Sequence, residues 1–192
     1  MLNRLRPQVK VIIDPVAKRI PINPNILTII GLLISVLSAY MFSQKNLLLG
    51  GLFIALSGIV DMLDGAVARN HSTRTRFGGI LDSTSDRFAD AIILIGIIYG
   101  GYVDWLIGVL AIVACLSVSY VRARVEAEGI KGNVGIAERA ERLVILIAGV
   151  ILSIIFNLDI FMYYAVVLVV ILGYLTVLQR IYYAWEQLKD NN

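Results

Sequence analysis

Residues 61–86 read DMLDGAVARNHSTRTRFGGILDSTSD and place four aspartates between two strongly apolar segments. Asp61 and Asp64 are spaced i,i+3, and Asp82 and Asp86 are spaced i,i+4, so in helices each pair shares one face. Four carboxylates that face one another repel strongly in a low-dielectric site unless a cation lies between them. Such an all-oxygen cluster suits a hard divalent ion such as magnesium, calcium or manganese. With one Cys and one His, the chain has no means to build a zinc site from thiolates or several imidazoles.

The segments around this stretch have the composition of a membrane protein. The 192 residues are 58% hydrophobic with a mean hydropathy of +0.81, well outside the usual range of soluble domains. With no long polar stretch, no room is left for a separate soluble domain. We therefore predict an all-α, integral membrane bundle of six transmembrane helices, each near the length that crosses a bilayer. The six apolar segments are 26–43, 46–68, 79–101, 103–125, 141–157 and 160–183.

The distribution of basic residues predicts the orientation and the division of the chain. All Lys and Arg residues except Lys45 fall on one side of the predicted bundle, so the positive-inside rule places both termini and the aspartates in or next to the cytoplasm. Residues 1–22 mix apolar and basic side chains and are expected to form an amphipathic segment at the membrane surface. Residues 23–187 would form the membrane catalytic domain, and 188–192 a cytoplasmic tail. The expected location is the cell membrane, with several passes.

Ionisable residues inside membrane spans are energetically costly and are therefore functional candidates. Gly65, Gly78 and Gly79 would let phosphates approach the backbone, while Arg69 offers a two-pronged phosphate donor and Thr75 a nearby hydroxyl. This combination favours metal-assisted phosphoryl chemistry with one lipid substrate and one soluble substrate. Two other interpretations remain open: the acids pair structurally with neighbouring arginines, or they line the path of a divalent cation transporter.

The same stretch resembles the signature of the CDP-alcohol phosphotransferases, D-x2-D-G-x2-A-R-x8-G-x3-D-x3-D, at every fixed position. The matching residues are Asp61, Asp64, Gly65, Ala68, Arg69, Gly78, Asp82 and Asp86. The six-span architecture is also similar to that family's minimal core, so the resemblance covers nearly the whole chain.

This resemblance implies that the four aspartates hold two ions, Mg2+ or Mn2+, and that Asp86 also takes the proton of the acceptor hydroxyl. A CDP-activated lipid would be the donor and CMP the leaving group. By the same resemblance, the P-N-x-x-T element would place Asn25 and Thr28 near the cytidine. We expect a homodimer in contact with membrane lipids and no nucleic-acid partner. The full set expected to bind the CDP-lipid is Asn25, Thr28, Asp61, Gly65, Ala68, Arg69, Thr75 and Gly78.

The acceptor is indicated by basic residues in the second half of the chain. Lys131, Arg139, Arg142 and Arg180 are candidates to bind a phosphorylated acceptor, because clustered Arg and Lys commonly clamp phosphate. The plain alternative is that they are ordinary positive-inside charges of a loop. The strings SYVRARVEAEG and GIAERAERLVIL resemble the branch of the family that uses inositol 1-phosphate and makes phosphatidylinositol phosphate or archaetidylinositol phosphate. Glycerol 3-phosphate is the rival acceptor.

Overall fold

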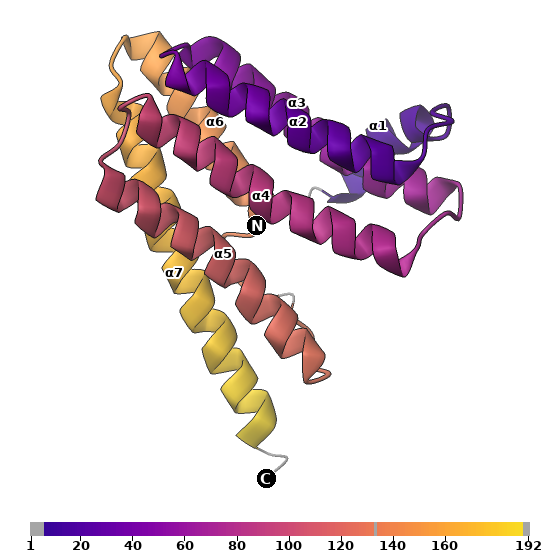
Figure 1. The fold of residues 1–192 in the computed structure, drawn as a ribbon. Coiled ribbons are helices and arrows are strands. Elements are labelled where there is room, and N and C mark those ends of the chain that lie inside the picture. Colours follow the sequence, from indigo (N-terminus) through magenta and orange to yellow (C-terminus); the bar gives the residue numbers. More distant parts are fainter. Residues whose placement is uncertain (1–5, 133, 190–192) are drawn as a thin grey trace. The chain divides into compact units, whose positions relative to one another are not determined.

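The computed structural model describes residues 6–132 and 134–189, and the regular structure of these residues is entirely helical. They form seven helices in two compact units, Met1–Gly100 and Gly101–Asn192 (Figure 1). The ends of the predicted N-terminal segment and tail, residues 1–5 and 190–192, lie outside the described residues. The first unit contains α1 (Arg6–Ala17), α2 (Pro24–Ser43), α3 (Leu47–Asn70) and α4 (Arg76–Tyr99). The second contains α5 (Trp105–Ala127), α6 (Arg139–Phe156) and α7 (Ile160–Lys189).

Among the described helices, α2, α3, α5 and α7 are long and apolar enough to cross a membrane. The other two predicted spans form helices too, but these carry more charge. Five charged residues lie in α4, and α6 opens on RAER. The all-helical, membrane-type architecture is thus confirmed, while six crossings stay a prediction.

Helix ends differ from the predicted spans by a few residues, and local capping explains two of the shifts. The Asn23 side chain accepts a hydrogen bond from the Asn25 amide at 3.0 Å, and α2 accordingly begins at Pro24. The Thr75 hydroxyl accepts from the Gly78 amide at 2.9 Å, which starts α4 at Arg76 rather than at residue 79. At the other end of the chain, α7 continues past residue 183 to Lys189, and residues 184–189 contain no Gly or Pro that would end the helix.

The first unit is held together by α2, which packs against both α3 and α4. Ser35 of α2 and Ser57 of α3 share a buried hydrogen bond of 2.7 Å between their hydroxyls. At Gly96 the backbones of α4 and α2 touch, since a β-carbon there would lie 2.4 Å from the carbonyl oxygen of Ala39. Small residues at helix contacts permit this close approach. As a result, α3 and α4 are both fixed to one central helix.

The N-terminal helix α1 packs on the end of α3, where Ala17 meets Ala66 and Val67 in a buried apolar cluster. Figure 1 shows α1 beside the ends of α2 and α3. Its opposite face carries Val11 and Ile12, which are 74% and 72% exposed. One apolar face is therefore buried in the protein and another faces outward, as expected of a helix that also contacts lipid.

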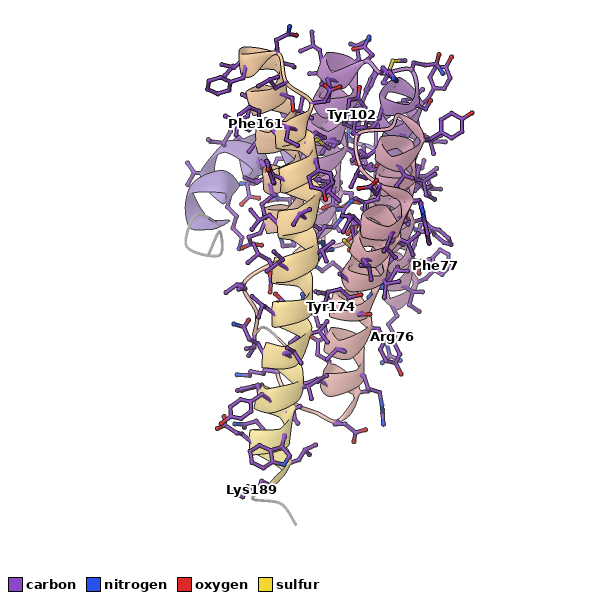
Figure 2. All side chains as sticks on the ribbon, turned by 90° about the vertical axis from the view of Figure 1, so that its left-hand side faces the viewer. Arg76, Phe77, Tyr102, Phe161, Tyr174 and Lys189 are labelled. Atoms are coloured by element: carbon purple, nitrogen blue, oxygen red, sulfur yellow. The ribbon has the colours of Figure 1, made fainter. Side chains whose placement is uncertain are left out.

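In the second unit α7 packs against α5 and α6. Gly173 of α7 meets Ala114 of α5, and Gly149 of α6 meets Ala165 of α7, where added β-carbons would lie 2.9 and 2.5 Å from the alanine methyls. Figure 2 shows Tyr102 at the same end of this unit as Phe161, where α7 begins, and Lys189 at the opposite end. The same small-residue packing thus joins the helices of both units.

Replacing Gly96 with Ala should lower the melting temperature of the purified protein in detergent by several degrees. The new methyl would meet backbone atoms of Ala39, which side-chain rotation does not relieve, and overpacking of this kind costs about 1–3 kcal/mol. Gly79→Ala in the same helix is the matched control, because nothing lies within 4 Å of its added β-carbon. Equal melting temperatures for the two variants would refute the close α2–α4 contact.

Candidate active site

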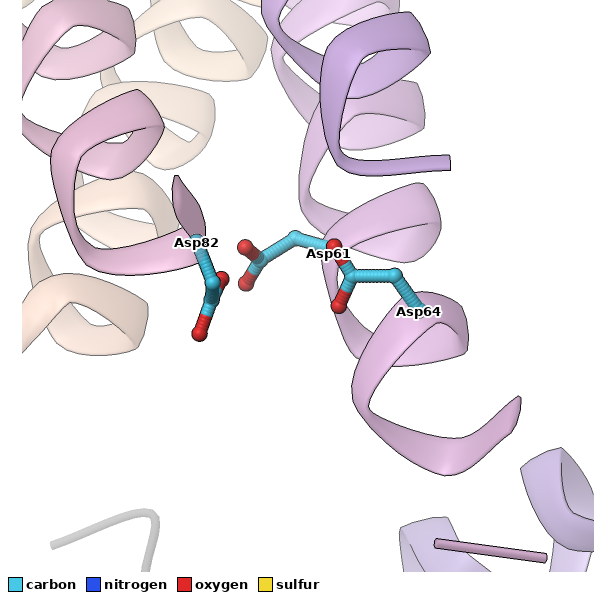
Figure 3. Close-up of side chains that lie close together, drawn as sticks. All are labelled: Asp61, Asp64 and Asp82. Carbon is cyan, nitrogen blue, oxygen red and sulfur yellow. The ribbon is translucent and has the colours of Figure 1, made fainter. Parts of the chain in front are cut away.

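Three of the four aspartates meet between α3 and α4. Asp61 and Asp64 extend from α3 and Asp82 from α4, and each offers a carboxylate oxygen within 4.8 Å of the other two (Figure 3). The i,i+3 spacing puts the two α3 acids on one face of that helix, as predicted. Asp64 is only 4% exposed, whereas Asp61 and Asp82 are half-buried. The structure therefore brings together acids from both halves of the 61–86 stretch.

Thr28 of α2 orients the most buried of these acids. Its hydroxyl donates a hydrogen bond to Oδ2 of Asp64, with 2.6 Å between the oxygens. The family resemblance placed Thr28 near the cytidine, and sequence reasoning did not find this contact with Asp64. The two residues are 36 positions apart, so the contact depends on how α2 packs against α3. No local sequence signal reports that packing.

Asp86 lies one turn beyond Asp82 on α4 and is half-buried. Among the described residues, the close group consists of Asp61, Asp64 and Asp82 and does not include Asp86. Asp61, Asp64 and Asp82 thus form a close group, and Asp86 lies outside it, one turn beyond Asp82 on α4.

Several residues expected to bind the CDP-lipid lie around Gly78. A β-carbon on Gly78 would be 3.0 Å from both the Asn25 side-chain oxygen and the Thr75 hydroxyl, so these three residues are neighbours. A β-carbon on Gly65 would lie 3.2 Å from Nη1 of Arg69. Both signature glycines therefore lie close to polar side chains, and the approach of phosphates to their backbone stays a prediction. Ala68 is half-buried one residue before the exposed Arg69.

A cavity of about 750 Å³ opens beside these residues, between the chain that enters α2 and the loop from α3 to α4. Asn25 and Thr75 line it, together with His71 and Thr73, which sequence reasoning had not singled out, and Arg74, which it had considered only as a structural partner of the aspartates. Asn25 and Thr28 are three residues apart on α2, so the first turn of this helix borders the cavity and also reaches Asp64. The cavity and the three acids therefore belong to one region of the first unit.

The three-acid group fits a divalent cation. Its ligand atoms are all oxygens, the donors that Mg2+ and Mn2+ prefer. The Thr28 hydroxyl satisfies one carboxylate oxygen but brings no positive charge, so like charges within 4.8 Å still repel. A bound cation would relieve this repulsion. The three acids are therefore a candidate metal site.

The basic residues predicted to hold the acceptor phosphate lie in the second unit, in different environments. Lys131 is exposed and Arg139 is half-buried, whereas Arg142 and Arg180 are 3% and 2% exposed. Arg180 donates to the carbonyls of Val118 and Val134, the latter at 2.7 Å from Nε. Its Nη2 also lies 3.9 Å from Glu138. The Arg180 guanidinium therefore joins α7 to α5 and to the chain before α6.

Comparison with known proteins agrees with this arrangement. Residues 21–174 match the model of the CDP-alcohol phosphatidyltransferase family. The archaetidylinositol phosphate synthase of Methanothermobacter thermautotrophicus is 45% identical over 189 residues, covering 98% of this chain and 96% of the relative.

Two crystal structures of Mycobacterium tuberculosis phosphatidylinositol phosphate synthase are 30% identical to the chain. The one with CDP-DAG bound has a TM-score of 0.80 and covers 91% of this chain and 94% of that chain. The one in complex with manganese and citrate has a TM-score of 0.78, with coverages of 89% and 88%. Because the family model spans most of its length, the chain belongs to the CDP-alcohol phosphatidyltransferases and is an enzyme of that family.

Proposed function

We propose that this enzyme transfers the lipid-phosphate group of a CDP-activated lipid, CDP-archaeol or CDP-diacylglycerol, to L-myo-inositol 1-phosphate and releases CMP. The observation that carries the reaction class is the group of three acids in the same region of the first unit as the cavity lined by Asn25 and Thr75. The choice of acceptor is supported by the relatives, which are named as synthases of inositol phosphate lipids.

In the proposed reaction a hydroxyl oxygen of the acceptor attacks the lipid-side phosphorus of the diphosphate. A new phosphorus–oxygen bond forms, the bond to the CMP oxygen breaks, and Asp86 takes the proton of the hydroxyl. Its place one turn beyond Asp82 suits this role, because it is near the acids without belonging to their close group.

The donor is held by groups of the first unit. Asp61, Asp64, Asp82 and Asp86 would bind two ions, Mg2+ or Mn2+, which when bound neutralise the charge of the diphosphate and of the leaving group. The cavity beside Asn25 and Thr75 is the proposed place of the nucleotide. The complete proposed CDP-lipid set is Asn25, Thr28, Asp61, Gly65, Ala68, Arg69, Thr75 and Gly78.

The acceptor phosphate is assigned to the basic residues of the second unit, Lys131, Arg139, Arg142 and Arg180. Arginine and lysine suit a dianionic phosphomonoester, and Arg in particular offers paired donors to its oxygens. Exposed Lys131 is accessible to a soluble ligand.

For the membrane arrangement we propose six crossings by α2 to α7, with both termini and the active site on the cytoplasmic side. The exposed apolar face of α1, around Val11 and Ile12, supports its placement at the membrane surface within segment 1–22. Residues 23–187 would form one catalytic domain, residues 188–192 a tail, and the enzyme a homodimer.

Purified enzyme in lipid with Mg2+ should release CMP only when a CDP-lipid and inositol 1-phosphate are both present. Each acceptor would be tested with CDP-archaeol and with CDP-diacylglycerol, and mass spectrometry of the lipid product identifies donor and acceptor together. Glycerol 3-phosphate and free inositol are the comparison acceptors. Turnover of glycerol 3-phosphate without turnover of inositol 1-phosphate would refute the proposed acceptor and leave the family assignment intact.

Replacing Asp86 with Asn should lower turnover about 100-fold or more while CDP-lipid binding is largely retained, because the variant lacks the proposed base. Turnover is measured as CMP release and binding by titration of the CDP-lipid. Asp104→Asn is the matched control: Asp104 is exposed at the start of α5 and makes no side-chain cap hydrogen bond. An Asp86→Asn enzyme as active as this control would exclude Asp86 as the base.

Replacing Thr28 with Val should weaken Mn2+ binding about 10-fold or more, because the hydrogen bond that orients Asp64 is lost. Electron paramagnetic resonance of a Mn2+ titration measures this without any substrate. Thr28→Ser keeps the hydroxyl and should bind Mn2+ nearly as the unaltered enzyme does. If Thr28→Val binds Mn2+ with unchanged affinity, the hydroxyl does not support the metal site.

A further inference from the structure

The chain between α5 and α6 is held in place by a buried hydroxyl of α7. Thr176 is fully buried, at 0% exposure. Its Oγ1 accepts a hydrogen bond from the Ala137 amide at 3.0 Å and donates one to the Leu172 carbonyl of its own helix at 2.8 Å. Both hydrogen-bonding functions of this hydroxyl are therefore used, one of them on the loop before α6.

Gly135 brings the same loop directly onto the Thr176 methyl group. Its φ of +133° lies in the region that favours glycine, and a β-carbon there would be 2.4 Å from Cγ2 of Thr176. Ala137, two residues later, is fully buried, and its carbonyl accepts from Nη1 of Arg142 at 3.1 Å. The peptide groups of Ala137 are thus bound on one side by α7 and on the other by α6.

This attachment matters for α6 because the helix has no side-chain cap of its own. Glu138 occupies the N-cap position without a capping hydrogen bond, and Arg139 is the first helical residue. Glu138 therefore makes no capping hydrogen bond that would fix the start of α6, and the contacts of the preceding chain supply its attachment. That chain is the 134–138 segment, which Thr176 and Gly135 hold against α7.

We propose that Thr176 is a positioning residue for the acceptor site: by holding Ala137 and Gly135 it sets the direction in which the start of α6 presents Arg139. The inference rests on the proposed function, in which Arg139 binds the acceptor phosphate. Thr176 is fully buried, so its side chain is not accessible to either substrate. Its loss should therefore affect the acceptor far more than the CDP-lipid, a difference that general loss of stability does not produce.

The test compares Thr176→Val with Thr176→Ser in steady-state kinetics, with each substrate varied in turn. Val keeps the shape of Thr but removes the hydrogen bond to Ala137, so KM for inositol 1-phosphate should rise about fivefold while KM for the CDP-lipid stays unchanged. Ser keeps the hydroxyl and should restore the acceptor KM. An unchanged acceptor KM in Thr176→Val, or an equal rise in both KM values, overturns the proposal.

Gly135 supplies a second test that does not depend on folding of the Val variant. Gly135→Ala should raise the acceptor KM in the unaltered background and raise it less in the Thr176→Ser background, where the methyl that the new β-carbon meets is absent. Equal effects in the two backgrounds overturn the proposal. If the unaltered enzyme does not use inositol 1-phosphate, the proposed function is refuted and this inference with it. If the unaltered enzyme turns over inositol 1-phosphate but the variants leave the acceptor KM unchanged, only the role of Thr176 is refuted.

Discussion

The packing of the first unit has to overcome the repulsion among three carboxylates, whose oxygens lie within 4.8 Å of one another. Holding like charges so close together costs free energy, and the hydrogen bond that the Thr28 hydroxyl donates to Asp64 offsets part of this cost. The rest of the unit keeps the acids together in spite of this cost. α2 packs against both helices that carry them, through the Ser35–Ser57 hydrogen bond on one side and the Gly96–Ala39 contact on the other. The helix contacts therefore maintain a site that a cation can complete.

The reaction class could be predicted from the sequence because its evidence is local. The spacing of Asp61 and Asp64 fixes their common face whatever the rest of the chain does. Gly78 lies against Asn25 and Thr75, whereas the approach of phosphates to the signature glycines stays a prediction. The family and its enzyme class are confirmed by the match over residues 21–174. Helix ends were less predictable from hydropathy. For example, α4 begins earlier than its hydropathy suggests, because Thr75 caps it.

Contacts between distant segments could not be predicted in this way. Thr28 reaches Asp64 only because α2 and α3 pack in one particular register, and hydropathy carries no information about register. In the loop from α3 to α4, Thr75 was predicted to bind the CDP-lipid, whereas the place of His71 and Thr73 in the lining of a cavity was not predicted. Arg180 was recognisable as a cation of the second half, but its burial against backbone carbonyls depends on the path of residues 134–138. Sequence patterns identify which side chains can bind or donate, but they do not determine which distant residues these side chains contact.

Asp64 and Arg180 are both buried ionisable side chains, and their surroundings differ. Arg180 is surrounded by acceptors that the second unit itself supplies: the Val118 and Val134 carbonyls and, at 3.9 Å, Glu138. Asp64 has further acids beside it, so its surroundings add negative charge instead of compensating it. The acids of α3 and α4 are therefore candidates to bind a cation, and the carbonyl contacts of Arg180 fix the loop on which the start of α6 depends.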